Sequence, residues 1–528
     1  MPKFDVVIVG AGFAGMYMLH RVRQLGLSAV VIEKGSGVGG TWFWNRYPGA
    51  RCDVESLSYS YSFSNELQQE WEWSHRYATQ PEILRYANHV ADRFDLRRDI
   101  LFNTAVKSAA FDEKNSDWEV KAEGGGLFRA HYLVMATGCL SVPKAPDLPH
   151  LGEFKGRILH TADWPDEMDF TGLNVGVVGT GSSGIQSIPL IARQAKHLTV
   201  FQRTPNYSIP AWNGPLKAEE QREMKARYNE LRDKSRNSLS GDYADECVVS
   251  ILDLTDEQRE TEFEKRWLEG GFNYQYAFID LMTSEEANEL AAEFVRRKIR
   301  ATVRDAKTAE LLCPKNHAFG AKRLCVDTDY YETFNRDNVS LIDLKADPIH
   351  DFVSDGIRTV RKCIPLDVLV LATGFDAMTG ALSKIDIRGR GGVALKDRWR
   401  DGPKAYLGLA AAGFPNLFMI TGPGSPSVLA NVLVAIEQHV EWISGLLAFA
   451  RKNKVTVIEA DADAQEDWAR HVTEGAAKTL YMKANSWYLG ANVPGKPRVF
   501  MPYADGVSTY GRICSDVAAK GYDGFHLS

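Results

Sequence analysis

The stretch Asp5-Val6-Val7-Ile8-Val9-Gly10-Ala11-Gly12-Phe13-Ala14-Gly15 decides the fold. Its apolar run predicts a buried β-strand. The pattern Gly-x-Gly-x-x-Gly that follows predicts a tight turn into a helix whose N-terminus binds a dinucleotide pyrophosphate. The next predicted strand, residues 28–32, ends in Glu33, where a carboxylate can accept hydrogen bonds from ribose hydroxyls. This first unit therefore predicts an FAD or NAD site.

A second unit of the same kind begins at residue 174. The apolar run 174–178 precedes Gly179-Thr180-Gly181-Ser182-Ser183-Gly184, and the next predicted strand, residues 198–202, ends in Arg203. A guanidinium at this position can pair with a 2′-phosphate, which indicates NADP. One glycine motif alone is a weak signal, but two correctly placed motifs with different strand ends predict a protein that binds two dinucleotides.

Two further apolar strands, residues 132–138 and 368–374, each end in Ala-Thr-Gly, and such strands mark crossings between the nucleotide domains of flavoproteins. We therefore predict an α/β fold: a two-dinucleotide-binding flavoprotein with two Rossmann-like domains and a helical insert in the NADP domain. The insert is expected because residues 285–299 have helical periodicity. The predicted parts are the first FAD part at 1–142, the first NADP part at 143–213 after a linker, the insert at 214–320, the second NADP part at 321–380, and the second FAD part at 381–528, whose C-terminal loop closes over NADP.

Composition restricts the partners and the compartment. The net charge of −6 comes with no basic stripe, which argues against nucleic acid. The most apolar stretch, residues 428–450, contains several polar residues and is expected to be a buried helix, so no membrane partner is predicted. The seven cysteines form no CxxC motif, so we expect no metal site and no disulfide framework. Because the first strand leaves no room for a signal peptide, we expect a cytoplasmic protein, and we expect a monomer, with a dimer left open.

Two longer motifs identify a family. Residues 154–165 follow the pattern Phe-x-Gly-x-x-x-His-x-x-x-Trp-Pro, and residues 39–53 contain Gly-x-Trp, Tyr-Pro-Gly and Asp at set spacings. Both patterns resemble the signatures of Baeyer–Villiger monooxygenases, flavoenzymes that insert an oxygen atom beside a ketone carbonyl. The resemblance extends to residues 487–496, and residues 422–427 and 436–442 are most similar to the phenylacetone monooxygenase type.

The resemblance implies cofactors, substrates and site residues. The cofactors are FAD and NADPH, and the substrates are a small-molecule ketone and O₂, which react through a peroxide on the flavin C4a carbon to give an ester or lactone. The implied FAD contacts are Gly10, Gly12, Gly15, Glu33, Gly40, Thr41, Trp42, Tyr59 and Val106. The implied NADPH contacts are Thr180, Gly181, Ser182, Ser183, Gly184, Ile185, Gln186, Arg203, Thr204, Lys322 and Trp487. Further implied cofactor contacts are Arg51, Cys52, Asp53, Arg323 and Val432.

Arg323 and Asp53 are the catalytic residues that the resemblance implies. An anionic oxidant in a dry pocket needs a fixed cation, and a guanidinium supplies one without losing its proton. Asp53 would orient that cation, although the two residues could also form a purely structural ion pair. Two other functions stay open: an N- or S-oxygenating flavin monooxygenase, which Trp164-Pro165 and Asp53 disfavour, and a redox-sensing FAD and NADP binding protein without turnover.

Two local expectations concern the linker and the substrate loop. His160, in a run expected to link the domains, is interpreted as a residue for domain docking rather than an acid or base, with Trp164 as a packing residue. Residues 425–432 follow an apolar strand and a Gly-Pro-Gly turn, which predicts an exposed connection of the kind that builds sites. The resemblance implies that this loop lines the ketone site.

Overall fold

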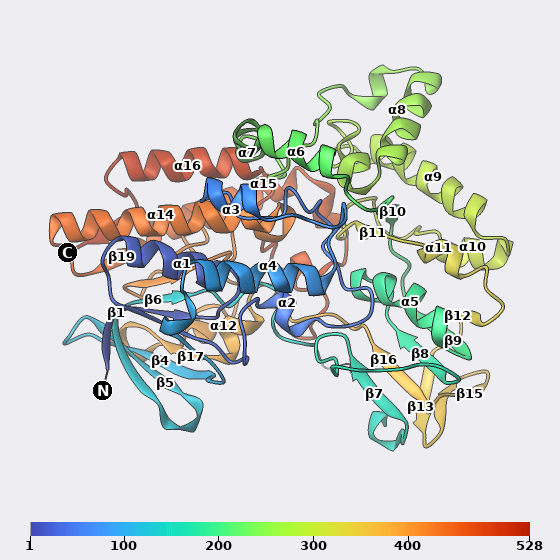
Figure 1. Ribbon diagram of the computed structural model, residues 1–528, viewed down its shortest axis with the longest axis horizontal. Helices are drawn as coiled ribbons and strands as arrows, with labels where there is room; N and C mark the ends of the chain where they lie inside the picture. Colours follow the sequence, from blue (N-terminus) through green and yellow to red (C-terminus); the bar gives the residue numbers. More distant parts are fainter. Residues whose placement is uncertain (1, 145, 147, 149) are drawn as a thin grey trace.

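The computed structural model describes residues 2–144, 146, 148 and 150–528, and it contains two mainly parallel sheets side by side (Figure 1). The first is an eight-stranded sheet in the order β17-β4-β5-β6-β1-β2-β3, with β18 also paired to β6. Its strands are β1 (Lys3–Val9), β2 (Ala29–Ile32), β3 (Ile100–Leu101), β4 (Val106–Asp112), β5 (Asp117–Ala122), β6 (Leu127–Met135), β17 (Asp386–Arg388) and β18 (Leu417–Met419). The apolar run of the first glycine motif thus forms a central strand, with parallel neighbours on both sides.

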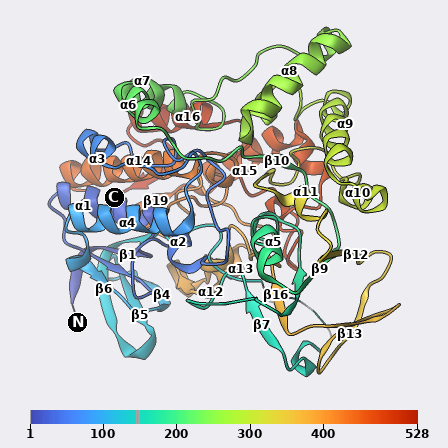
Figure 2. The same cartoon turned by 45° about the vertical axis from the view of Figure 1, so that its right-hand side comes forward.

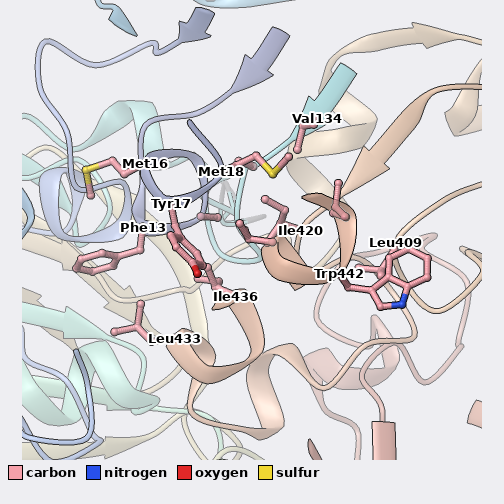
Figure 3. Close-up of a cluster of buried hydrophobic side chains, with 14 of the residues drawn as sticks. Phe13, Met16, Tyr17, Met18, Val134, Leu409, Ile420, Leu433, Ile436 and Trp442 are labelled. Carbon is pink, nitrogen blue, oxygen red and sulfur yellow. The ribbon is translucent and has the colours of Figure 1, made fainter. Parts of the chain in front are cut away.

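Helix packing covers one face of this sheet. The helix α1 (Phe13–Gln24) follows the first glycine motif and lies against α14 (Val432–Asn453). Figure 3 shows buried apolar side chains of this core, with Tyr17 of α1 close to Ile436 of α14. Further helices of this part are α2 (Thr41–Trp44), α3 (Asn65–Glu70), α4 (Gln80–Arg93), α12 (Gly380–Lys384), α13 (Leu395–Arg398), α15 (Ala462–Ala477) and α16 (Val507–Ala519). The core of this part is therefore built from segments near the N-terminus and segments near the C-terminus of the chain.

The helix α14 has the length and composition of a membrane span, the one such helix in the described part of the chain. However, 67% of its most apolar window is buried inside the protein. The predicted buried helix is confirmed, and its apolar character is explained by packing against α1 and α16.

The second sheet has five strands in the order β12-β9-β8-β16-β7, all parallel to their neighbours. Its strands are β7 (Arg157–His160), β8 (Asn174–Val178), β9 (His197–Gln202), β12 (Val339–Asp343) and β16 (Val368–Leu371). The second glycine motif connects β8 to α5 (Ser182–Gln194), which packs on β8 and β9. A three-stranded antiparallel sheet, β13 (Ile349–Val353), β14 (Gly356–Thr359) and β15 (Cys363–Pro365), adjoins it.

The helical insert has helices beside both parts of the molecule. Among the described residues, 214–320 contain helices and no strand. The helices are α6 (Ala218–Ala226), α7 (Tyr228–Arg236), α8 (Asp256–Glu269), α9 (Glu285–Thr302) and α10 (Ala306–Leu312). In both views α6 and α7 lie beside α16, while α9 and α10 lie near α11 (Tyr330–Thr333) beside the second sheet (Figures 1 and 2). The short strands β10 (Ser208–Pro210) and β11 (Cys325–Asp327), one before and one after the insert in the sequence, pair with each other in parallel.

The two crossings between the sheets run side by side. The backbone N–H of Lys144 donates to the oxygen of Gly374, and the N–H of Asp376 donates to the oxygen of Val142. The predicted domain limits stay a proposal, which the strand content of the two sheets supports. Residues 145, 147 and 149, in the proposed linker, and residue 1 lie outside the described residues.

Candidate functional site

Both nucleotide helices begin without a side-chain cap. The helix α1 starts after Gly12 and α5 after Gly181, and neither has an acidic residue in its first turn. Their first backbone N–H groups are therefore available to an anion. Gly15 is required sterically, because a Cβ there would lie 1.8 Å from the oxygen of Gly10. A Cβ at Gly181 would meet no atom within 4 Å, so there is open space in front of α5.

Glu33 lies beside the first of these helix starts. One carboxylate oxygen accepts the N–H of Ala11 at 2.6 Å and the other accepts the N–H of Gly35 at 2.6 Å. A carboxylate oxygen has further lone pairs, which suit the hydroxyls of a ribose. Val106 begins β4 close to the same loop, since the N–H of Thr104 donates to the backbone oxygen of Glu33. These residues fit the adenosine end of FAD.

Three cations gather at the end of β9. Arg203 is exposed directly after the strand, and Lys322 and Lys345 lie close enough to interact with each other. Burial lowers the pKa of Lys322, and the positive charges of Arg203 and Lys345 lower it further. In the described part of the chain, none of the three side chains has a carboxylate or hydrogen-bond partner. Three unpaired cations next to a helix start fit the 2′-phosphate of NADP.

The Asp53 and Arg323 side chains form a bidentate ion pair. The guanidinium donates from Nε to Oδ2 at 3.1 Å and from Nη2 to Oδ1 at 2.8 Å. Both side chains are about one fifth exposed, 23% for Arg323 and 21% for Asp53. Burial works to lower the pKa of Arg323, but the negative charge of Asp53 and its hydrogen bonds raise the pKa above its ordinary value. Arg323 is therefore a permanent cation held in one orientation.

Two more groups contact the Arg323 guanidinium. Its Nη1 donates to the backbone oxygen of Val428 at 2.6 Å, and its Cζ lies 4.9 Å from the ring centroid of Phe272. Neither contact could be predicted from the sequence, because Val428 contributes a backbone atom and Phe272 looks like an ordinary core residue.

On the FAD side of the Asp53–Arg323 pair lie buried residues, two of them aromatic. The indole N–H of Trp42, in α2, donates to the hydroxyl of Tyr59 at 3.1 Å, and the two rings meet edge to face. Cys52 is buried, and burial raises the pKa of its thiol well above the usual range. The neutral thiol beside Asp53 is therefore a packing group and not a nucleophile.

The remaining predicted cofactor contacts lie on the NADP side, at the FAD part and at the starts of helices. On the NADP side, the Thr180 hydroxyl donates to the oxygen of Thr204 at 2.9 Å, which ties the glycine turn to the strand end after Arg203. Ile185 is fully buried in the core, so only its backbone is available to a cofactor. Gln186 faces the FAD part, where its amide donates to the oxygen of Arg51 at 3.1 Å. The other predicted residues lie at element starts: Gly40 and Thr41 at α2, Ser182, Ser183 and Gly184 in α5, Val432 at α14 and Trp487 in a short 3-10 turn.

Residues 157–160 are an edge strand and not a linker. β7 pairs with β16, which places His160 beside Leu371. The His160 Nδ1 accepts the N–H of Ala162 at 3.1 Å, so Nε2 carries the proton and donates to the Thr373 hydroxyl at 3.2 Å. Burial lowers the pKa of His160, and the neutral ring ties the edge strand to the second crossing. Trp164 is buried against Phe170, as expected for a packing residue.

The predicted exposure of residues 425–432 is wrong. Ser425 and Ser427 are fully buried, and Val428 and Leu429 are half-buried. The reason is that the C-terminal segment covers the loop: the N–H of Tyr503 donates to the oxygen of Ser425 at 2.9 Å. The loop still reaches the site, through the contact between the Val428 oxygen and Arg323.

Other site types find no support in the described residues. No group of three or more His, Cys, Asp or Glu side chains there could hold a metal ion. All seven cysteines are free. Two uncapped helix starts after glycine turns, together with an ion pair that joins the two nucleotide-binding parts, define the class: a two-dinucleotide-binding flavoprotein.

Comparisons with known proteins agree and give the family. Residues 7–290 match the family profile described as pyridine nucleotide-disulphide oxidoreductase. A Baeyer–Villiger monooxygenase of Pseudooceanicola batsensis is 43% identical, over 98% of this chain and 95% of its own. A phenazine N-monooxygenase of Lysobacter antibioticus is 42% identical, over 99% of this chain and 97% of its own.

Solved structures give the same result. An oxidized steroid monooxygenase bound to NADP is 52% identical, with a TM-score of 0.96 over 99% of each chain. The OTEMO complex with FAD and NADP is 39% identical, with a TM-score of 0.97 over 100% of each chain. The chain belongs to the flavin-dependent Baeyer–Villiger monooxygenases. It is an FAD- and NADPH-dependent enzyme that inserts one oxygen atom of O₂ next to a ketone carbonyl, as the two motifs predicted.

Proposed function

We propose that oxygen insertion takes place beside Arg323, on an apolar ketone. The single observation that carries this assignment is the bidentate pair between Arg323 and Asp53, which joins the two nucleotide-binding parts at one point. A fixed guanidinium stabilises negative charge that develops on oxygen, and Asp53 keeps the guanidinium in place in both half-reactions. FAD bound in the first cradle would supply the redox chemistry, accepting hydride from NADPH and reacting with O₂.

The protein's other residues bind, orient and exclude water. Glu33 would accept hydrogen bonds from the FAD ribose, while Arg203 and Lys322 would hold the 2′-phosphate of NADPH. Their lack of other partners in the described part of the chain supports this role. Trp487, next to the buried Tyr488, would close the nicotinamide side.

The substrate class follows from what surrounds Arg323. Phe272, Val428 and Trp487 are partly buried apolar residues near the guanidinium or its loop. Such a site favours an apolar ketone, whose carbonyl oxygen is its one polar group. Oxygenation of a ring nitrogen is the second candidate, because a phenazine N-monooxygenase is about as similar as the Baeyer–Villiger relative.

A substrate panel tests the proposal. The FAD-loaded enzyme is given NADPH, O₂ and either an alicyclic ketone, an aryl ketone or an N-heteroarene, and product masses are recorded with NADPH consumption. One added oxygen on the ketones, lost in Arg323→Ala, supports the proposal. Oxygenated N-heteroarene with unchanged ketones would assign the second candidate. NADPH-reducible FAD without any oxygenated product would instead indicate a redox-sensing protein.

The compartment and the assembly are part of the proposal. We propose a monomer that works in the cytoplasm without nucleic acid or membrane. The seven free cysteines support a reducing compartment. Light scattering during size-exclusion chromatography of the holoenzyme tests the assembly, and a mass of twice 58.9 kDa would replace the monomer with the dimer.

A further inference from the structure

The side chain and the main chain of Arg323 are held by different parts of the molecule. The guanidinium is held from the FAD part, by Asp53 and by the backbone oxygen of Val428. The backbone oxygen of Arg323 is held from the NADP part, because it accepts the side-chain amide N–H of Asn206 at 3.1 Å. The position of the guanidinium therefore depends on both parts.

Asn206 and Arg323 stand at matching positions before two paired strands. Asn206 lies two residues before β10 and Arg323 two residues before β11, and these strands pair in parallel from Ser208 and Cys325 onward. The N–H of Cys325 donates to the oxygen of Tyr207 at 3.1 Å. The Asn206 amide adds a further hydrogen bond just outside the pair, and its Oδ1 accepts the N–H of Tyr207 at 3.1 Å, which fixes the orientation of the amide.

The buried thiol of Cys325 connects the same group to the helix of the NADP motif. Its Sγ lies 3.1 Å from the Asn206 amide nitrogen and 3.7 Å from the Arg323 oxygen. It also lies 3.4 Å from the hydroxyl of Ser182, in the first turn of α5. Burial raises the pKa of the thiol to about 12, so it stays neutral, and its one S–H can be given to the Arg323 oxygen while the sulfur accepts from Ser182. The start of α5 is therefore joined to the main chain of Arg323.

A second connection runs through the end of β9. The Thr180 hydroxyl, in the glycine turn, donates to the oxygen of Thr204 at 2.9 Å, two residues before Asn206. Arg203, the proposed contact to the 2′-phosphate, precedes Thr204 directly. We use the name NADP cradle for the glycine turn 179–184 together with residues 203–204. Asn206 thus lies between the NADP cradle and Arg323.

We propose that Asn206 is a positioning residue that fixes the main chain of Arg323 relative to the NADP cradle. The inference rests on the proposed role of Arg323. Asp53 and the Val428 oxygen fix the guanidinium relative to the FAD part alone, whereas the Asn206 amide fixes the other end of the same residue relative to α5 and residues 203–204. Without the amide, the main chain at Arg323 can shift, and the guanidinium leaves the place where charge develops on oxygen.

The variant Asn206→Asp tests this proposal, with Asn213→Asp as the matched control. Asn213 is also half-buried, its Nδ2 donates to the oxygen of Tyr77 at 3.2 Å, and its Oδ1 accepts the N–H of Tyr77 at 2.9 Å. In both variants an ionised aspartate keeps the acceptor for a backbone N–H, loses the donor to a backbone oxygen and adds one negative charge.

We expect Asn206→Asp to keep its FAD and its melting temperature at the level of the control. At saturating NADPH its ester yield per NADPH should fall about fivefold or more below that of the control, with the surplus appearing as hydrogen peroxide. Asn206→Ala adds no charge and should show the same fall. A fall in Asn206→Asp that Asn206→Ala does not share would be an effect of the added charge and would overturn the proposal.

A readout besides activity is the position of Arg323 in crystals of the holoenzymes with NADP⁺. Both the main chain and the guanidinium should keep the wild-type position in Asn213→Asp and leave it in Asn206→Asp. An unchanged position, or an ester yield equal to that of the control, would overturn the proposal. A double-mutant cycle provides a second check, because Asn206→Asp should add little to the defect of Arg323→Ala, whereas additive effects would show that Asn206 acts independently of the guanidinium. Absence of ester in the wild type would instead reject the proposed function, and the crystals alone would then decide the role of Asn206.

Discussion

The backbone of Gly49 lies directly against the carbonyl oxygen of Gln186: a Cβ at Gly49 would be 2.2 Å from that oxygen. Gly49 also has a φ of +85°, which favours glycine. Two side-chain contacts join the same surfaces, since the Tyr47 hydroxyl donates to Gln186 Oε1 at 2.8 Å and the Gln186 amide donates to the oxygen of Arg51. The Tyr-Pro-Gly signature is therefore the contact between the FAD part and α5.

This contact explains why one short motif serves both cofactors. The helix α5 starts at the NADP cradle, and the run that contains Gly49 ends at Asp53, which holds Arg323. A shift of α5 would therefore move Asp53 and the guanidinium together. The pair is positioned by the interface as well as by its own hydrogen bonds.

Coenzyme preference should depend on the cations after β9. Arg203→Ala should weaken NADPH binding by about 1.5–3 kcal/mol and leave NADH almost unchanged, because one charge-assisted contact to the 2′-phosphate is lost. Lys322→Ala should act in the same direction. The measurement is kcat/KM with both coenzymes. A wild type without a preference for NADPH, or an Arg203→Ala variant that keeps it, would contradict the assignment.

Replacement of Arg323 should affect ester formation much more than reduction of FAD by NADPH. Arg323→Ala should bind FAD and be reduced by NADPH, but its ester formation should fall by about 10²-fold or more, because the fixed cation is gone. Asp53→Ala should slow both reduction and ester formation, since the guanidinium loses its orientation. Stopped-flow reduction and product yield measure the two halves, and ester formation near the wild-type rate in Arg323→Ala would remove Arg323 from the chemistry.

His160→Gln tests docking against acid–base chemistry. Glutamine can accept the Ala162 N–H and donate to Thr373, so the shape of the pH profile should stay the same. Imperfect placement of the edge strand should lower the ester yield by about tenfold. Loss of one limb of the pH profile, with FAD still bound, would show that His160 transfers a proton.

The sequence predicted the parts of the site that depend on special backbone geometry or on strand ends. The glycines of both motifs, Glu33 and Arg203 are of this kind. It could not predict Phe272, because an aromatic residue in a helical insert looks the same whether it packs in the core or against a guanidinium. The sequence predicts a linker in the run that contains residues 157–160, because their partner strand, β16, lies far away in the sequence. Parallel pairing of this kind leaves no local signal.

Stability should depend on pH through Asp327, which the reaction does not use. Asp327 is buried and accepts the Ser208 hydroxyl and the N–H of Tyr330, and burial raises its pKa to about 7. Because the folded-state pKa lies above the unfolded value, the folded protein binds the extra proton. The stabilisation is complete at low pH and is lost as the pH rises through about 7.

Asp327→Asn removes the titration and can keep both contacts. Its Oδ1 can accept the N–H of Tyr330, while its Nδ2 donates to the Ser208 hydroxyl oxygen, whose own proton can turn to the backbone oxygen of Cys325. Between pH 6 and pH 8.5 the wild type should lose about 1.5 kcal/mol more unfolding free energy than the variant. Urea unfolding at the two pH values measures this difference. An equal pH dependence of both proteins would show that Asp327 stays ionised in the fold.

Selectivity for the ketone should depend on the outer side chains of the loop before α14. Val428 and Leu429 are half-buried, whereas Ser427 is fully buried with a φ of +37°. Val428→Ala and Leu429→Ala should therefore shift the relative rates of two ketones by about 1–3 kcal/mol, since they change the volume of an apolar pocket. Reduction of FAD without ketone should hardly change, because the loop holds no proposed NADPH contact.

Ser427→Val is the contrasting variant: a β-branched residue is strained at positive φ, so it should lower the melting temperature. If Val428→Ala and Leu429→Ala also lower the melting temperature while the relative ketone rates stay those of the wild type, the loop is a packing element and does not line the substrate site.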